Sequence, residues 1–287
     1  MPSNWGLAWK RLRSTMTGYR KLRSVLFFVL ALALLFFIPG TAVRAQGSPA
    51  ANSQIESPTP SEDGLHVSIT PYLWFAGVHG TAGVLGHDTS VSAGFGDIFN
   101  YLNIGAMGQL EVRYNRVIMP VDFLWMKLSD DKGVPLNDLG VESIKAKMTE
   151  TMLAPKIGYR VADGKRVKVD ALIGIRYWHL STDLALQPPE LGRYGQSADW
   201  VDAIAGGRIQ VAVTPKAFVA IVGDAGGGSA RSDYQVGGFL GYKINRKCAL
   251  LLGYRYLSVN YRSHGSDEFV YDVNMPGLMI GATINLK

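Results

Sequence analysis

The chain has 287 residues, with 29 Lys and Arg against 23 Asp and Glu, and its formal net charge at pH 7 is +6. That balance alone would suit a nucleic-acid-binding protein. However, residues 1–45 hold seven of the basic residues and no acidic one, which leaves 22 basic against 23 acidic residues in the remainder. The location of the charge therefore argues against a nucleic-acid surface, and the one cysteine, Cys248, excludes an internal disulfide.

Residues 1–45 have the layout of a cleaved signal peptide. A basic n-region precedes an apolar run, VLFFVLALALLFFI, from Val25 to Ile38, and small residues follow in PGTAVRAQ. The apolar run has 14 residues, whereas a membrane-spanning helix needs about 20. We therefore expect export, cleavage after Ala45 and a mature chain that begins at Gln46.

Residues 46–64 are rich in Ser, Pro, Ala and Asn. Such a composition cannot bury much apolar surface, so it predicts a flexible periplasmic tether. The folded domain is expected to span residues 65–287.

Apolar residues alternate with polar or small ones along residues 65–287, and this period of two predicts an all-β chain. In LNIGAMGQLEVRY, for example, Leu102, Ile104 and Leu110 alternate with Gln109 and Glu111. Ten strands are predicted: Val67–Ala76, Leu102–Tyr114, Val117–Leu128, Thr149–Arg160, Val167–Leu180, Asp199–Val213, Ala217–Ala225, Ser232–Ile244, Cys248–Val259 and Pro276–Leu286.

Residues 77–101 leave the strand count open. GTAGVLGHDTSVSAGF is compatible with a protruding hairpin, which would give twelve strands, and GDIFNYL with a helical turn across the barrel mouth. Eight strands are the alternative if two short strands fail to form.

The connections between the predicted strands alternate in length. Short turns are expected at 114–116, 162–166, 214–216 and 245–247, and longer polar segments around 130–140, 182–198, 226–233 and 262–268. Short periplasmic turns and long outer loops are typical of an outer-membrane β-barrel, and an even strand count places both termini on the periplasmic side.

The apolar face of the strands is expected to point outward, as in a closed antiparallel transmembrane β-barrel and unlike a soluble barrel. The chain has 33 glycines, well above the usual ~7%, and many lie on the polar face, where small residues suit a crowded interior. Aromatic residues near the strand ends predict an aromatic girdle at the two membrane interfaces. Its members are Tyr114, Trp125, Tyr159, Tyr177, Tyr242 and Tyr256.

The same alternation turns charged side chains into the lumen. In LLLGYRYLSVNYR, Leu250, Leu252 and Tyr254 face lipid, so Arg255 faces inward. We predict an interior charge network of Glu111, Arg113, Asp122, Lys156, Arg160, Asp170, Arg176, Asp202, Arg208, Asp224, Lys243 and Arg255. Such charges must pair, because an unpaired buried ion costs several kcal/mol. The network predicts a largely plugged lumen, with a polar path for small solutes as the alternative.

The segments ITPYLW, GDIFNYLNIGAMGQLEVR, DWVDAIAGGR and LLLGYRYLSVNYR resemble Gram-negative outer-membrane β-barrel proteins of the OmpA-like transmembrane and opacity-porin type. The resemblance covers nearly all of residues 65–287. It implies a location in the bacterial outer membrane and, as partners, outer-membrane lipid, lipopolysaccharide and the outer-membrane assembly machinery. It implies a structural or surface-exposed role. Such barrels usually end in an aromatic residue, whereas this chain ends INLK.

An outer-membrane enzyme acting on lipid A or peptides would need a His or Asp constellation at the outer rim. The candidates are His79, His87 with Asp88, His179 with Asp183, and His264 with Asp267. They are spread over four segments without a nucleophile motif, so we expect no catalysis. No phosphate-binding loop or metal-ligand spacing occurs, and no cofactor is expected.

Overall fold

The computed structural model describes residues 64–84, 87–136, 141–187, 193–263 and 268–286. The expected signal peptide and all but the last residue of the expected tether lie outside the described residues, as do His264 and Asp267. Among the described residues, no helix is both long enough and apolar enough to cross a membrane.

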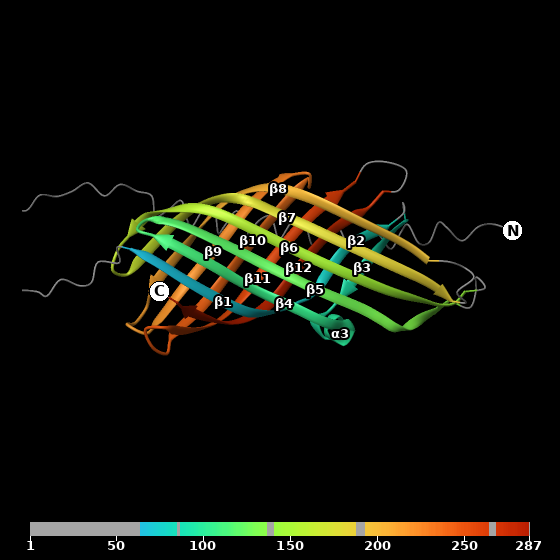
Figure 1. Ribbon diagram of the computed structural model, residues 1–287, viewed down its shortest axis with the longest axis horizontal. Coiled ribbons are helices and arrows are strands. Elements are labelled where there is room, and N and C mark those ends of the chain that lie inside the picture. The colour runs from blue at the N-terminus through green and yellow to red at the C-terminus, as the bar shows by residue number, and fades with distance from the viewer. Residues whose placement is uncertain (1–63, 85–86, 137–140, 188–192, 264–267, 287) are drawn as a thin grey trace, which may run out of the picture. The chain divides into compact units, whose positions relative to one another are not determined.

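Ten antiparallel strands form a closed barrel (Figure 1). They are β1 (Leu65–Ala76), β4 (Leu102–Tyr114), β5 (Val117–Leu136), β6 (Val141–Asp163), β7 (Val167–Gln187), β8 (Arg193–Ala212), β9 (Ala217–Gly228), β10 (Ser232–Lys243), β11 (Cys248–Arg262) and β12 (Val270–Asn285). Each pairs with its neighbour in chain order, and β1 pairs with β12 to close the wall. The ten-stranded closed barrel predicted from the sequence is confirmed.

Residues 77–101 form two extra strands and a short helix. β2 (Val78–Val84) continues along the edge of β12 beyond β1, and β3 (His87–Ala93) returns antiparallel to β2. Gly80 is the point of closest approach: its φ is +151°, and a Cβ there would lie 2.0 Å from the Asp272 carbonyl oxygen. The hairpin alternative was therefore correct, but the barrel itself keeps ten strands.

The helical turn expected across the barrel mouth is instead attached to the outside of the wall. The helix α3 (Phe95–Tyr101) begins after Gly94, whose N–H donates to Asp97 Oδ2 at 2.9 Å. The Phe95 ring packs edge-on against Phe75 of β1, with centroids 4.8 Å apart. Phe75 and the exposed Leu73 are two residues apart on β1, so their side chains point to the same, outer face of the wall. Figure 1 shows α3 at the margin of the barrel.

The two ends of the barrel differ. The turn end carries the short connections at 115–116, 164–166, 213–216 and 244–247, together with the start of β1 and the end of β12. The loop end carries the other connections, and there β5 to β8 run well beyond their neighbours (Figure 1). The predicted strands 117–128 and 149–160 were too short because only about ten residues cross a membrane, whereas backbone pairing continues past the apolar band.

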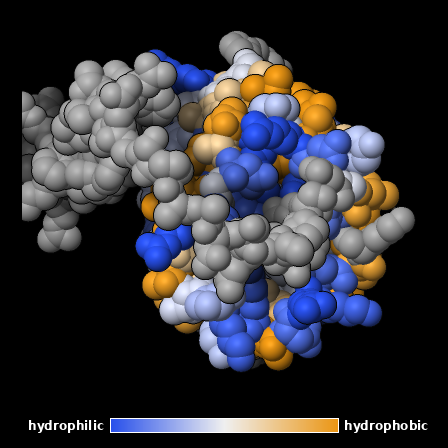
Figure 2. All heavy atoms as spheres, turned by 90° about the vertical axis from the view of Figure 1, so that its left-hand side faces the viewer, coloured by the Kyte–Doolittle hydropathy of each residue, from blue (hydrophilic) through white to orange (hydrophobic). Residues whose placement is uncertain are grey.

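The wall has an apolar outer face and a buried inner face. Large apolar side chains such as Leu73, Ile173, Leu240 and Leu278 are more than half exposed, and alternate residues of the same strands are buried. The view onto the turn end shows hydrophilic residues gathered on that face and hydrophobic ones along the sides (Figure 2). A continuous exposed apolar surface of this kind is typical of a membrane-facing wall.

Candidate functional site: the barrel interior

Arg255 of β11 lies inside the barrel and is 5% exposed. Its Nη2 forms an ion pair with Asp122 Oδ2 of β5 at 2.9 Å, and its Nη1 donates to the Tyr72 hydroxyl at 3.2 Å. Tyr72 donates in turn to Asp122 Oδ1 at 2.7 Å, which closes a triangle. The guanidinium also stacks on the Trp74 ring at 4.8 Å. Burial of this charge is offset by an ion pair, a hydrogen bond and a cation–π contact.

A second cluster surrounds Arg176 of β7, which is fully buried. Its Nη2 donates to Asp224 Oδ1 of β9 at 2.6 Å, and its Nη1 pairs with Asp233 Oδ1 of β10. Trp178 Nε1 donates to the second Asp233 oxygen at 3.0 Å. Asp224 also pairs with Lys156 of β6. Two carboxylates and two cations therefore balance in the middle of the lumen.

A third cluster lies closer to the turn end. Arg208 of β8 holds both oxygens of Glu111 with its terminal nitrogens, at 2.6 and 3.1 Å, and its Nε donates to Asp170 Oδ2 at 2.8 Å. Arg160 Nε donates to the other oxygen of Asp170 at 2.9 Å. Such bidentate arginine pairs are the strong form of the contact.

The predicted network has three further members, and one of them, Asp202, lies directly opposite Arg176 across β7 and β8. Lys243 is exposed at the turn end of β10, and Arg113 is half-buried on β4. Asp202 is fully buried, and its Oδ1 accepts the Ala230 N–H at 2.7 Å. Asp202 therefore anchors the backbone of the β9–β10 turn.

Sequence reasoning missed three members of these clusters. Asp233 lies where the predicted outer segment 226–233 overlaps the predicted strand Ser232–Ile244, and the connection between β9 and β10 spans only residues 229–231. The other two are Tyr72 and Gln235, which occupy inward positions of their strands. Gln235 Nε2 donates to Asp224 at 2.6 Å. The alternation of the strands places both residues in the interior, but the predicted network included only charged residues.

The loop-end half of the lumen is filled by apolar side chains. Its centre is an aromatic stack, with the Trp200 and Tyr261 rings 4.1 Å apart and nearly parallel, and with Trp178 and Trp200 5.8 Å apart. Its other buried members include Leu124, Met126, Met152, Leu180, Leu257, Val259, Phe269, Tyr271, Val273 and Met275. We call these residues the aromatic plug. The alternation along the strands does not predict the aromatic plug, because it indicates polar or small residues at most inward positions.

One carboxyl group lies within the aromatic plug. Glu150 of β6 is 2% exposed, and its Oε1 accepts a hydrogen bond from the Tyr271 hydroxyl at 3.3 Å. A carboxyl group in such surroundings is costly to ionise.

A cavity of about 90 Å³ lies between the charge clusters. Lys156, Arg208 and Arg255 contribute to its lining. Two buried atoms of its lining, Arg255 Nε and Gln235 Oε1, have no hydrogen-bond partner among the described residues. A space of this size has room for a few water molecules.

The six residues of the predicted aromatic girdle lie on the outer face of the barrel. Tyr114, Tyr159 and Tyr242 are about half exposed near the turn end. Toward the loop end, the Tyr177 hydroxyl donates to Asp199 at 2.5 Å and the Tyr256 hydroxyl to Asn274 at 2.6 Å.

The two rim histidines whose side chains the structure describes, His79 and His179, have different partners. His79 Nδ1 lies 3.1 Å from Ser92 Oγ on the β2–β3 hairpin. His179 pairs at 2.8 Å with Asp199 of β8 on the outer wall, rather than with Asp183. Asp88 is 3.1 Å from Arg262. Within the described ranges, no three His, Cys, Asp or Glu side chains come together as a metal site.

No family model and no curated protein sequence matches the chain. Solved structures of similar fold include Ail, the attachment invasion locus protein of Yersinia pestis, with 12% identity, a TM-score of 0.34, and coverage of 78% of this chain and 99% of that one. The translocator domain of the autotransporter NalP from Neisseria meningitidis shares 14% identity, with a TM-score of 0.41 and coverage of 78% and 89%. The outer membrane protease OmpT from Escherichia coli shares 8%, with a TM-score of 0.38 and coverage of 78% and 94%.

Proposed function

We propose that the chain is an integral outer-membrane β-barrel with a structural or surface-exposed role and a closed lumen. Membrane placement is supported by the apolar outer face, where residues such as Leu73 and Ile173 are 63% exposed. An apolar surface encircling a soluble protein would drive aggregation, whereas in a bilayer it is covered by lipid.

The observation that carries the closed lumen is the burial of Arg176 and Trp178 near the middle of the barrel. Arg176 forms ion pairs with Asp224 and Asp233 and has no exposed surface. Trp178, which belongs to the aromatic plug and is 1% exposed, donates a hydrogen bond to Asp233. A water-filled pathway would expose these groups to solvent. Two stacked layers, one of paired charges and one of aromatic side chains, therefore separate the two ends.

A swelling assay on proteoliposomes tests this proposal. Liposomes that contain the refolded barrel are diluted into iso-osmotic solutions of small neutral solutes of increasing size, with protein-free liposomes as the baseline. We expect swelling rates equal to the baseline for every solute. A rate that rises above the baseline and falls with solute size would replace the closed barrel with a pore.

A small passive pore is the second candidate, and the cavity of about 90 Å³ beside Arg255 is the observation that favours it. Charged side chains such as Asp122, Lys156 and Arg208 contribute to the lining of the cavity, as they would in a path for polar solutes. It accommodates only a few waters, and the aromatic plug lies between it and the loop end. Passage would require that plug to open, which the swelling assay would detect.

We propose no catalytic role and no cofactor. His79 and His179 lie on separate parts of the rim, and in the described part of the chain no carboxylate contacts His79, whose hydrogen-bond partner is Ser92. As partners we propose outer-membrane lipid, lipopolysaccharide and the assembly machinery that inserts barrels. Export through a cleaved signal peptide belongs to the same proposal.

A further inference from the structure

We propose that the outer face of β5 to β8 binds one phosphorylated, multiply acylated glycolipid of the outer leaflet, of the lipid A type. The acyl chains would lie in an apolar depression of the wall and the phosphates on three lysines above it. The proposal depends on the membrane placement proposed above and adds a specific site and ligand class to it.

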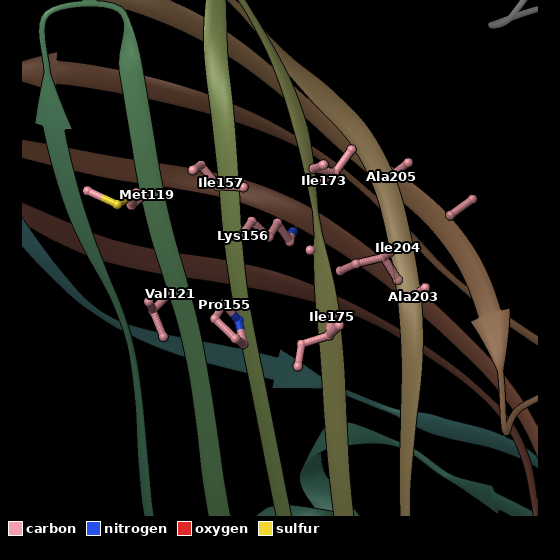
Figure 3. A pocket seen from close by; sticks show the side chains of 12 residues that line it. Met119, Val121, Pro155, Lys156, Ile157, Ile173, Ile175, Ala203, Ile204 and Ala205 are labelled. Carbon is pink, nitrogen blue, oxygen red and sulfur yellow. The ribbon is translucent and has the colours of Figure 1, made fainter.

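The first observation is a depression of about 820 Å³ in the lipid-facing wall. Figure 3 shows its side chains spread over β5, β6, β7 and β8. Pro155, Ala203 and Ala205 are small and form the floor, while Ile157 and Ile173, both more than half exposed, stand higher beside them. The depression is shallow and open to the outside of the barrel.

The second observation is a group of three exposed lysines above the depression on the same strands: Lys127 of β5, and Lys145 and Lys147 of β6. Lys127 is an even number of residues from the lipid-facing Val121 on β5, and Lys145 and Lys147 are an even number from Pro155 on β6. All three lysines therefore point outward. Lys127 faces Thr149, and Lys147 faces Ser129, so the two lysines are diagonal neighbours across β5 and β6. Diagonal Cβ atoms lie roughly 7 Å apart in such a pair, which allows two ammonium groups to share one phosphate.

The height of the lysines matches the lipid headgroups. Lys127 follows Val117, at the turn end, by ten positions along β5. At about 3.3 Å per residue and a tilt near 40°, ten positions rise about 25 Å, which is the height of the apolar band of such barrels. Trp125, one outward position below, lies 5.4 Å under the Lys127 ammonium, as an interfacial aromatic residue would.

The depression and the lysines are within reach of one lipid. Val121, at the upper edge of the depression, and Lys127 are six positions apart on β5, about 20 Å along the strand. A molecule whose phosphates contact Lys127 and Lys147 would direct its acyl chains down the wall into the depression. Several chains are needed to fill a space of this width, which favours a multiply acylated glycolipid over a two-chain phospholipid.

The three lysines are grouped on β5 and β6, near few acidic side chains. Among the side chains that the structure describes, two carboxylates share the outward rim of these strands: Asp183, opposite Lys147, and Asp199, which is hydrogen-bonded to Tyr177 and His179. On the other side of the barrel, Arg262 bonds to both Glu268 and Asp88. The lysines therefore give β5 and β6 a charge complementary to phosphate.

The test measures lipid bound to the full barrel by native mass spectrometry in mild detergent, titrated with bis-phosphorylated lipid A. The variant K127A/K145A/K147A is compared with K216A/K243A/K247A, which removes three exposed lysines from the turn end. At about one kcal/mol per basic residue near a lipid surface, the first variant should bind about 100-fold more weakly. The control should bind as the parent does, and lipid A without phosphates should bind as weakly as the first variant.

The depression has its own variant, A203L/A205L, which fills the floor without altering charge. It should also weaken binding of lipid A, while an anionic phospholipid, phosphatidylglycerol, should bind weakly to parent and variant alike. Equal lipid A binding by parent and K127A/K145A/K147A would overturn the proposal, and so would equal affinity for phosphatidylglycerol and lipid A. A dimer in the parent that A203L/A205L dissociates would assign the face to a second copy. The swelling assay is independent of all these results, so a failure here leaves the closed barrel intact.

Discussion

Arg176 of β7 contacts Asp233 of β10 across the lumen, although two strands of the wall, β8 and β9, separate them. Neither side chain has exposed surface. The pair therefore joins segments of the barrel that share no backbone hydrogen bonds, and it contributes to stability by fixing the barrel's cross-section.

Replacement of Arg176 by Met, which keeps the length of the side chain, leaves Asp233 and Asp224 without that cation. Removal of one partner of a buried pair typically costs about 3 to 5 kcal/mol. We expect a lower free energy of unfolding by that amount in a urea titration of the barrel in lipid vesicles. Arg116→Met, in an exposed turn, is the control and should change it by less than about 0.5 kcal/mol. Equal stability of the two variants would mean that the lumen is hydrated around Arg176.

A lysine at Ile173 tests the outward direction of the apolar face. Ile173 lies in the depression and is 63% exposed, while Val213, 64% exposed, lies at the turn end. In a bilayer, Lys near the midplane costs about 2 to 4 kcal/mol and near the interface about 0 to 1. Ile173→Lys should therefore destabilise the refolded barrel much more than Val213→Lys. If both substitutions cost equally little, the outer wall would face water.

Gly174 tests how closely the strands approach one another. An ideal Cβ at Gly174 would lie 2.3 Å from the Pro155 carbonyl oxygen, whereas one at Gly238 would meet nothing within 4 Å. Gly174→Ala should lower the free energy of unfolding by about 1 to 3 kcal/mol, the usual cost of overpacking, and Gly238→Ala should not. An unchanged denaturation midpoint for Gly174→Ala would show that β6 and β7 can separate there without cost.

The expected signal peptide is tested by N-terminal sequencing of the exported protein. Cleavage after Ala45 predicts a first residue of Gln46, because small residues precede the cut and the apolar core is too short to span the membrane. Recovery of a chain that starts at Met1 from the outer-membrane fraction would contradict cleavage.

The sequence predicted the ten strands because the period of two is a local signal that backbone pairing must obey. It also placed Arg255, Asp122 and Arg176 on inward positions. It did not reveal which charges meet, because partners such as Arg176 and Asp233 lie three strands apart and their contact depends on barrel curvature and register. The aromatic plug was missed for a related reason. Trp200 and Tyr261 occupy inward positions on strands whose inner faces carry both polar and apolar residues. The sequence around each residue does not indicate which distant residue it will contact.

Planar-bilayer recording of single refolded barrels tests the closed lumen most directly. We predict that the parent inserts without conductance steps above the bare bilayer. Trp178→Ala combined with Trp200→Ala, which removes the centre of the aromatic plug, serves as the positive control and should raise conductance. Steady, discrete steps from the parent would contradict the closed lumen. If Arg255→Ala then shifted the selectivity of those steps toward cations, Arg255 would be part of the lining of an open pore.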